Sequence, residues 1–242
     1  RWALDRLLHR PYGALWSAKH PFMPSSAEWT PVLWSLQLQT ISIMALTHSN
    51  PLNKCSWCLG DPVMEAYHDR EWCVPVTTDH GMFEHLVLEG FQSGLSWRTV
   101  LHKREAFHVA LHGFDAESLL RFSATEREAF LANPQVIRNR LKLDAALHNA
   151  QTLVAFRDRH GKGFADYLWE FVGGTPLDGA REGSWPATTK ESDELSKALK
   201  SEGFKFIGST TLYAHMQATG LINDHWMSCP RYGEVKALAQ TF

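Results

Sequence analysis

From about residue 51 onward, apolar residues recur every three or four positions, which is the spacing that places them on one face of an α-helix. The longest such segment runs from Arg140 to His160 and is followed by Gly161, a residue type that commonly ends helices. Its apolar face carries Leu143, Leu147, Ala150 and Val154. No segment after residue 50 alternates apolar and polar residues with the period of two that is typical of a strand. The pattern therefore predicts an all-α domain over residues 51–242.

Capping residues predict where the other helices begin, because a short polar side chain can accept hydrogen bonds from the free amides of the first turn. Asn133-Pro134 predicts a turn, and a loop is expected over Thr175–Thr189. The predicted starts are Asp61 before Pro62, Ser96 before residues 97–111, Asp115 before a short helix, Ser123 with Glu126 before residues 124–131, Ser192 before a helix ending at Gly203, and Ser209 or Thr210 before one ending at Gly220. A further helix is expected over Phe164–Phe171.

Residues 1–50 have a different character from the rest of the chain. They hold four of the ten Trp residues and four scattered prolines, with no sustained helical spacing. One interpretation is a poorly ordered extension outside the domain. The other is a leader that is not translated, with Met44 as the true start. The mass of the N-terminal peptide of the native protein would decide between the two.

Composition narrows the class of protein. With 44% apolar residues among 242, the chain can bury a sizeable core, which excludes a purely disordered protein. The formal net charge of −2 does not by itself indicate a nucleic-acid partner. The longest apolar stretch, Val32 to Leu46, is interrupted by polar residues and too short to span a membrane, and no secretory signal is recognisable. We therefore expect an intracellular protein without a membrane partner.

Cysteine and histidine form two pairs at opposite ends of the predicted domain. Cys55 and His68 lie near its start, and His225 and Cys229 lie four residues apart near its end, on one face if that segment is helical. Two thiolates and two imidazoles would form a closed tetrahedral shell for one structural zinc ion. Alternatively, Cys55 and Cys58 form a redox pair or half of another shell. In the first interpretation, Cys58 and Cys73 remain as ordinary buried thiols.

Short motifs in a fixed order carry a family resemblance. They are Cys55-Ser56-Trp57, Asp61-Pro62, Tyr67-His68-Asp69, Glu71-Trp72, Leu88-Glu89-Gly90, Gly94-Leu95-Ser96-Trp97, Phe204-Lys205-Phe206, Met216-Gln217-Ala218 and Asn223-Asp224-His225. Together they resemble the constitutive 3-methyladenine DNA glycosylases, zinc-containing members of the helix-hairpin-helix glycosylase superfamily. The match runs from about Cys55 to Tyr232. It implies a helix-hairpin-helix fold and the excision of 3-methyladenine from alkylated double-stranded DNA, in the bacterial cytosol beside the chromosome.

The resemblance also implies roles for the residues that would bind the base. Methylation at N3 gives adenine a positive charge, so the pocket needs an aromatic face and a carboxylate more than a strong acid. By resemblance, Glu89 is the catalytic residue that contacts the flipped base, Trp97 stacks on it, and Tyr67 forms a wall near Trp57. Met64 stands where relatives often carry Tyr, and its sulfur can still pack against a base. Relatives also often carry Gly in place of Cys73.

A second set of residues is expected to hold the DNA. By resemblance, the Gly94-Leu95 turn enters the gap that the flipped base leaves, and the segment Asn133–Lys142 corresponds to the superfamily hairpin. This segment lacks the usual glycines, and a solvated basic helix start is an equally good interpretation of it. Its predicted phosphate contacts are Arg138, Arg140 and Lys142. Further positive charge near the pocket is expected from Arg98, Lys103 and Arg104.

The predicted reaction is hydrolytic and monofunctional. No lysine occupies a position that resembles the Schiff-base lysine of bifunctional glycosylases, so water should attack and leave an intact abasic site. Two other functions are kept as alternatives: a non-catalytic zinc module that binds nucleic acid or protein, and a zinc hydrolase, which would need an open metal position. A monomer is the default expectation.

Overall fold

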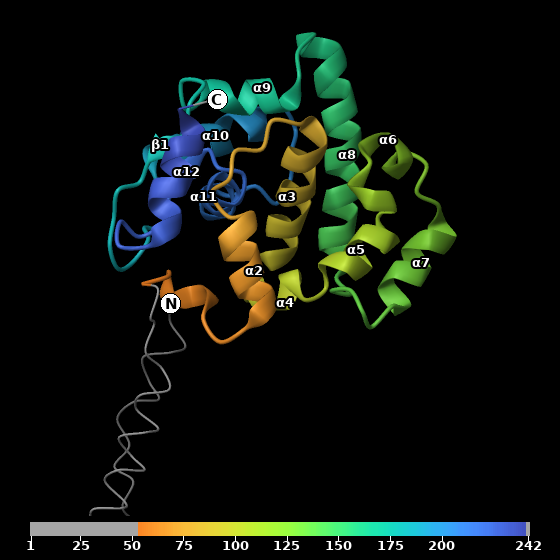
Figure 1. The fold of residues 1–242 in the computed structure, drawn as a ribbon. Helices are drawn as coiled ribbons and strands as arrows, with labels where there is room; N and C mark the ends of the chain where they lie inside the picture. The colour runs from red at the N-terminus through yellow and green to blue at the C-terminus, as the bar shows by residue number, and fades with distance from the viewer. Residues whose placement is uncertain (1–52, 241–242) are drawn as a thin grey trace, which may run out of the picture. The chain divides into compact units, whose positions relative to one another are not determined.

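The computed structural model describes residues 53–240. The predictions of a leader over residues 1–50 and of a start at Met44 therefore lie outside the described residues. Figure 1 shows the described chain as a group of helices in which the long helix α8 lies beside α3.

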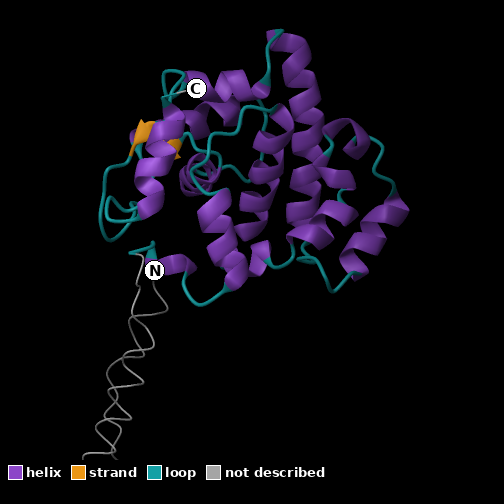
Figure 2. Cartoon of the chain, viewed as in Figure 1, coloured by secondary structure: helices purple, strands orange, loops and turns teal. Residues whose placement is uncertain are grey.

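The described residues are mostly helical, as predicted (Figure 2). The α-helices are α2 (Pro62–Arg70), α3 (Asp79–Gln92), α4 (Trp97–Leu101), α5 (Arg104–Ala110), α6 (Ala116–Leu119), α7 (Ala124–Ala132), α8 (Arg140–His160), α9 (Phe164–Glu170), α10 (Lys190–Ser201), α11 (Ser209–Ala218) and α12 (Pro230–Ala239). Two 3₁₀ helices, η1 (Ser56–Cys58) and η2 (His112–Phe114), complete the helical elements of this part of the chain.

Two short strands are an exception to the prediction that no strand follows residue 50. Strand β1 (Leu177–Asp178) pairs in parallel with β2 (Ile222–Asn223), with Leu177 opposite Ile222. Strands of two residues cannot display an alternating pattern, which explains why the sequence does not reveal them. The pairing fixes the loop between α9 and α10 beside the segment that follows α11.

Most of the predicted helix starts are confirmed by hydrogen bonds. Asp61 accepts from the amides of Val63 and Met64, and Ser123 forms a capping box with Glu126. Three predictions need correction. The helix that starts after Ser96 breaks after Leu101, so α4 and α5 are separate; Thr189 caps α10 while Ser192 is the third residue of that capping box; and α11 starts after Gly208 without a side-chain cap.

Helix α3 lies at the centre of the core. Its Met82, Phe83 and Leu88 have no exposed surface, and the helix packs against α8, α9 and α11. The apolar face predicted for α8 is confirmed, because Leu143, Leu147 and Ala150 are buried there and Val154 is partly buried against the same core. Burying a side chain of this size stabilises the fold by roughly 1.5–3 kcal/mol, so α3 and α8 form a rigid frame for the residues at their ends.

A second, smaller cluster of buried side chains includes residues of α2. It contains Met64, Tyr67, Trp72 and Leu101, together with all four cysteines. This cluster joins the start of the described chain to its end. Within residues 53–240, no helix is both long enough and apolar enough to cross a membrane.

Candidate functional site

A cavity of about 580 Å³ opens where α2, α3, α4 and α11 meet the loop before α10. All five residues predicted to contact the base line it: Trp57, Met64, Tyr67, Glu89 and Trp97. The remaining lining is mostly aromatic and small side chains, including Trp72, Trp185, Tyr213 and Ala214. The cavity is therefore an aromatic slot with one buried acidic group.

Glu89 brings a carboxyl group to this apolar slot. It lies on α3 and is only 5% exposed, and no hydrogen bond or ion pair joins its carboxyl to another described residue. Loss of hydration raises the pKa of this carboxyl from 4.5 to about 8. The glycine that follows Glu89 favours an interruption of the helix, but α3 continues through Gly90 to Gln92. The carboxyl is thus held by a continuous helix.

The aromatic wall is built from two helices and the short helix before them. The rings of Tyr67 and Trp97 lie 5.2 Å apart between centroids and are tilted by 50°. Trp57 contacts Tyr67 edge-on at 6.2 Å. Ser96 caps α4 by accepting from the amide of Thr99, which fixes the start of the helix that carries Trp97. Trp57, Tyr67 and Trp97 all line the cavity, where a planar guest can stack on an aromatic ring.

A further part of the cavity lining was not predicted from the sequence. It comes from Tyr213 and Gln217 on α11 and from Trp185 in the loop before α10. Asp224 connects these elements: its carboxylate accepts from Gln217 and Tyr213, and its backbone carbonyl accepts from the Trp185 indole at 2.8 Å. The motifs that contain Gln217 and Asp224 were visible in the sequence, but no periodicity or charge pattern assigns them a role.

The turn between α3 and α4 places Leu95 at the surface. Leu95 is 43% exposed, which by itself is ordinary for a leucine at a protein surface. Gly94 before it has φ of +78°, a backbone conformation that glycine adopts without strain. The amide of Leu95 donates to the carbonyl of Gln92 at 2.6 Å, which closes the turn.

Of the three basic residues predicted to contact phosphates, two are available and one is not. Arg138 and Arg140 are exposed where residues 133–139 join α7 to α8. Lys142 is a correction: it is only 8% exposed and donates to the backbone carbonyls of Phe91 at 2.8 Å and Ser93 at 2.6 Å. Its ammonium group satisfies carbonyls at the end of α3 and cannot reach a phosphate at the same time.

Two of the three basic side chains expected to add positive charge near the pocket are held by contacts within the protein. Lys103 donates to the carbonyls of Pro134 and Gln135, and Arg104 forms ion pairs with Glu71 and Glu84. Arg98 differs from them, because it lines the cavity and its side chain is 55% exposed while it pairs with Asp61 at 3.2 Å. Arg98 is therefore the basic side chain at the mouth of the slot.

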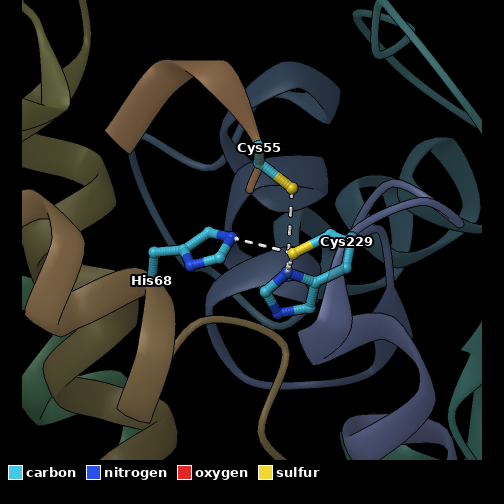
Figure 3. A group of neighbouring side chains, drawn as sticks. Cys55, His68 and Cys229 are labelled. Atoms are coloured by element: carbon cyan, nitrogen blue, oxygen red, sulfur yellow. Dashed lines mark hydrogen bonds between the residues drawn. The ribbon is translucent and has the colours of Figure 1, made fainter. Parts of the chain in front are cut away.

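The four predicted ligands form one buried cluster (Figure 3). Sγ of Cys229 lies 3.6 Å from Nε2 of His68 and 3.9 Å from Nδ1 of His225, and Sγ of Cys55 lies 3.8 Å from the same Nδ1. All four ligand atoms lie within 4.8 Å of one another. A tetrahedral zinc site with bonds of ~2.0–2.3 Å has ligand atoms ~3.3–3.8 Å apart, so this arrangement fits a metal ion.

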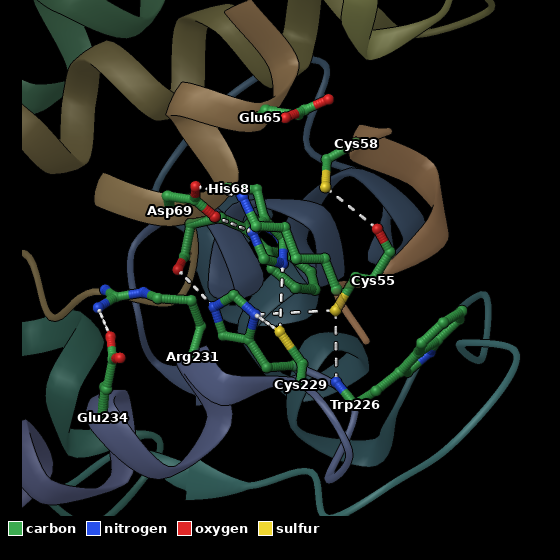
Figure 4. A network of polar contacts seen from close by, with 12 residues as sticks. Cys55, Cys58, Glu65, His68, Asp69, Trp226, Cys229, Arg231 and Glu234 are labelled. Atoms are coloured by element: carbon green, nitrogen blue, oxygen red, sulfur yellow. Dashed lines mark hydrogen bonds and ion pairs between the residues drawn. The ribbon is translucent and has the colours of Figure 1, made fainter. Parts of the chain in front are cut away.

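Further hydrogen bonds orient the ligands (Figure 4). Nδ1 of His68 lies 2.8 Å from Asp69, and Nε2 of His225 lies 3.1 Å from the carbonyl of Trp72, which leaves the other nitrogen of each ring turned to the cluster. Metal-bound imidazoles are held in this way by carboxylates and carbonyls. The amide of Trp226 also donates to Sγ of Cys55 at 3.4 Å. The donor set and its surroundings therefore both suit a metal.

The local structure of the second ligand pair differs from the one considered in the sequence. The segment from His225 to Cys229 is not helical; Cys229 is the residue that precedes α12. The two ligands converge through a turn instead of a helical face. Cys58 and Cys73 are buried thiols outside the four-residue cluster, as the zinc interpretation expects.

Comparison with known proteins gives concordant matches. The family model described as methyladenine glycosylase matches residues 57–232. DNA-3-methyladenine glycosylase 1 of Escherichia coli (strain K12) is 40% identical over 183 residues, which is 75% of this chain and 97% of that protein. DNA-3-methyladenine glycosylase of Haemophilus influenzae is 42% identical over 179 residues, or 73% of this chain and 96% of the relative.

Solved structures agree with these sequence matches. A crystal structure of 3-methyladenine DNA glycosylase I superposes with a TM-score of 0.71 at 43% identity, covering 74% of this chain and 98% of the other. A variant of such an enzyme in complex with 3-methyladenine gives a TM-score of 0.70 at 33% identity, over 74% and 96% of the two chains. The helical fold is thus that of the 3-methyladenine DNA glycosylases. The chain belongs to the methyladenine glycosylase family.

Proposed function

We propose that the cavity receives 3-methyladenine flipped out of alkylated double-stranded DNA, and that the protein hydrolyses the bond between this base and its deoxyribose. The observation that carries the proposal is that Glu89 and Trp97 line the same cavity. The names of the relatives and the neighbour that binds 3-methyladenine support this substrate. The protein is thereby an enzyme of base excision repair.

The electrostatics of the slot suit a cationic purine. N3-methylation leaves the nucleotide positively charged, so its base departs as a neutral molecule without strong acid catalysis. The guest's positive charge opposes the desolvation that keeps Glu89 protonated, so the carboxylate forms when the base enters. It then accepts from the exocyclic amine and offsets the charge. An uncharged adenine offers no such compensation and binds more weakly.

The aromatic residues supply the second part of recognition. Trp97 stacks on the cationic ring, an attraction of roughly 0.5–2 kcal/mol. Tyr67 borders the same space at a tilt of 50° to Trp97, and Trp57 and Met64 complete the wall. The thioether of Met64 is flexible, so this side chain can pack against the guest without imposing the fixed plane of an aromatic ring.

Water is the proposed nucleophile. No lysine lines the cavity among the residues that the structure describes, which supports a monofunctional reaction without a Schiff base. The bond between the sugar carbon and the base breaks with its electron pair going to the departing neutral base, water adds to that carbon and releases a proton to solvent, and the product is an intact abasic site. Glu89 acts in this scheme by holding the charged base, and we assign it the catalytic role on that ground.

The surface around the slot suits a bent duplex. Leu95 and Gly94 form the turn that fills the gap left by the flipped base, since an exposed apolar side chain on a tight turn can replace a base in the stack. Arg138 and Arg140 are proposed to contact phosphates beside the lesion. Lys142 belongs to the support of the turn and not to this contact surface.

One structural zinc ion is the proposed occupant of the cluster of Cys55, His68, His225 and Cys229. Four protein ligands complete a tetrahedral shell, and such an ion supplies cohesion between distant parts of a chain. None of the four ligands lines the cavity, so the reaction takes place away from the cluster. This separation favours the glycosylase over the zinc hydrolase considered from the sequence.

The assembly and location follow from the same proposal. The matched relatives with a stated source in the sequence comparison come from bacteria, which supports the predicted location beside the bacterial chromosome. A single chain carries every residue assigned to the slot, so a monomer is sufficient for the reaction.

Release of free base from methylated DNA tests the proposal. Duplex DNA treated with a methylating agent is incubated with the wild-type protein, and the released bases are separated by chromatography. Free 3-methyladenine and uncleaved abasic sites are expected, with little 7-methylguanine. A protein that binds the DNA without releasing any base is the non-catalytic module, and the proposal is then wrong.

A further inference from the structure

One face of α11 lines the cavity with polar groups to which the proposed reaction assigns no task. Thr210, Tyr213, Ala214 and Gln217 follow one another at helical spacing, and all four belong to the cavity lining. Gln217 is half-buried and carries the one amide on this face. The NH₂ end of an amide donates hydrogen bonds and its carbonyl end accepts them. The orientation of the Gln217 amide therefore decides which groups of a guest it can bind.

Asp224 fixes that orientation. Nε2 of Gln217 donates to Oδ2 of Asp224 at 2.8 Å. A carboxylate oxygen only accepts, so the amide nitrogen must face Asp224 and the carbonyl Oε1 must face away from it. No described residue donates to Oε1, and the backbone carbonyl of Gln217 is held by the amide of Cys73 at 2.8 Å. The free end of the amide is therefore an acceptor.

Asp224 is itself held rigidly. It has no exposed surface, and its Oδ1 accepts from Nε of Arg181 at 2.7 Å. The hydroxyl of Tyr213 donates to Oδ2, the same oxygen that receives Gln217. Gly179 allows the loop to pass at this point, because a Cβ there would lie 2.0 Å from Oδ1 of Asp224. The side chains that hydrogen-bond to this carboxylate, those of Arg181, Tyr213 and Gln217, are all donors. The Gln217 amide therefore has a single orientation.

We infer that Gln217 presents its carbonyl oxygen to position 6 of the purine and thereby favours 3-methyladenine over 3-methylguanine, with Asp224 as the residue that positions it. The inference rests on the proposed function. The amino group at position 6 of adenine has two hydrogens, one for the Glu89 carboxylate and one for Oε1, whereas guanine carries an oxygen there, which faces Oε1 as a second acceptor. An unpaired acceptor in a desolvated pocket discriminates strongly between such analogues.

The substitution Asp224→Asn reverses the amide. Nε of Arg181 can only donate, so the carbonyl oxygen of the new side chain stays beside Arg181 and its NH₂ group takes the place of Oδ2. Gln217 must then turn its own carbonyl towards this NH₂ group and present its NH₂ group to the cavity. The Tyr213 hydroxyl adapts, because it can accept as well as donate.

The readout is the ratio of kcat/KM for 3-methyladenine to kcat/KM for 3-methylguanine, measured on methylated DNA. Asp224→Asn is expected to lower this ratio by about tenfold or more, which corresponds to one hydrogen bond exchanged for a repulsion. Gln217→Met, which keeps the length of the side chain, should lower it by a smaller factor. Adding Asp224→Asn to Gln217→Met should change the ratio less than about twofold, because Asp224 acts through Gln217.

Arg181→Gln is the matched control: it removes a partner of Asp224 but leaves Gln217 donating to a carboxylate, so the ratio should stay at its wild-type value. The zinc content of each variant is measured, and Gln217→Met carries the test if Asp224→Asn loses the metal. Equal losses for both bases in Gln217→Met and Asp224→Asn indicate a structural role and overturn the inference, as does an unchanged ratio. A wild-type protein that releases neither base overturns the proposed function as well.

Discussion

Glu89 and Trp97 line the same cavity from consecutive helices, α3 and α4, that are joined by the turn at residues 93–96. The same turn carries Leu95, which is 43% exposed. The acidic group, the stacking ring and the side chain proposed to enter the duplex are therefore linked by one short segment. Insertion of Leu95 and capture of the base are expected to occur together.

The first prediction is that the buried carboxyl of Glu89 lowers the free energy of unfolding as the pH rises. Its pKa is about 8 in the folded protein and near the ordinary 4.5 in the unfolded chain. As pH rises through this interval, the unfolded chain releases the proton and the folded protein retains it, so the free energy of unfolding falls. Glu89→Gln abolishes this effect and should be more stable than wild type at pH 8.5, by on the order of a few kcal/mol.

Urea unfolding of both proteins at pH 5 and pH 8.5 measures the difference. The stabilising effect of Glu89→Gln should be small at pH 5 and reach its full size above pH 8, since both states of the wild type are then ionised. An effect of equal size at the two pH values would show that the carboxyl is not desolvated.

The second prediction concerns Leu95. Leu95→Ala removes an exposed side chain, so the free energy of unfolding should change by less than about 0.5 kcal/mol. Excision from duplex DNA should nevertheless fall about tenfold or more, because the gap left by the flipped base is no longer filled. Single-turnover rates on duplex and single-stranded DNA give the comparison. An equal loss on single strands would contradict a role in filling the duplex.

The third prediction separates Lys142 from Arg138. Lys142→Met leaves two carbonyls at the end of α3 without their donor and should destabilise the fold by roughly 1–3 kcal/mol. It should leave the salt dependence of DNA binding unchanged. Arg138→Ala should reduce the slope of log K against log salt by about 0.9 without affecting stability. If Lys142→Met lowers this slope as Arg138→Ala does, the buried position of Lys142 is not its position in solution.

The fourth prediction concerns the metal. Cys229→Ser should lose the bound zinc and unfold at a lower temperature, because four ligands hold residues 55, 68, 225 and 229 together. A chelator should lower the melting temperature of the wild type and leave that of the variant unchanged. Cys58→Ser is the control, since Cys58 lies outside the cluster and should not affect zinc content. Full zinc content in Cys229→Ser would exclude this ligand set.

Local chemistry made much of the fold predictable. Asp61 and Ser123 start helices through contacts with the next three residues, and such contacts depend on neighbouring sequence alone. The break between α4 and α5 depends on packing and was missed. The four metal ligands were predictable because few residue types bind zinc, although their convergence through a turn was not.

The site was predictable only in part, for a different reason. Family motifs pointed to Glu89 and Trp97, but the role of Lys142 depends on carbonyls some fifty positions earlier, which no local pattern records. Asp224 was seen as a motif residue and its donors were not, since Arg181 lies 43 positions away in a loop. Such long-range polar contacts appear only once the chain is folded.

The most direct test of the account is kcat/KM for 3-methyladenine excision by Glu89→Gln and wild type across pH 6 to 9, with the folded fraction and zinc content checked in parallel. The wild-type kcat/KM should rise with pH towards a plateau above the pKa of about 8, because free enzyme must release the Glu89 proton before it holds the cationic base. Glu89→Gln should be folded, zinc-loaded and at least about 100-fold slower, without this rise. A folded Glu89→Gln protein with the wild-type rate and pH profile would contradict the account.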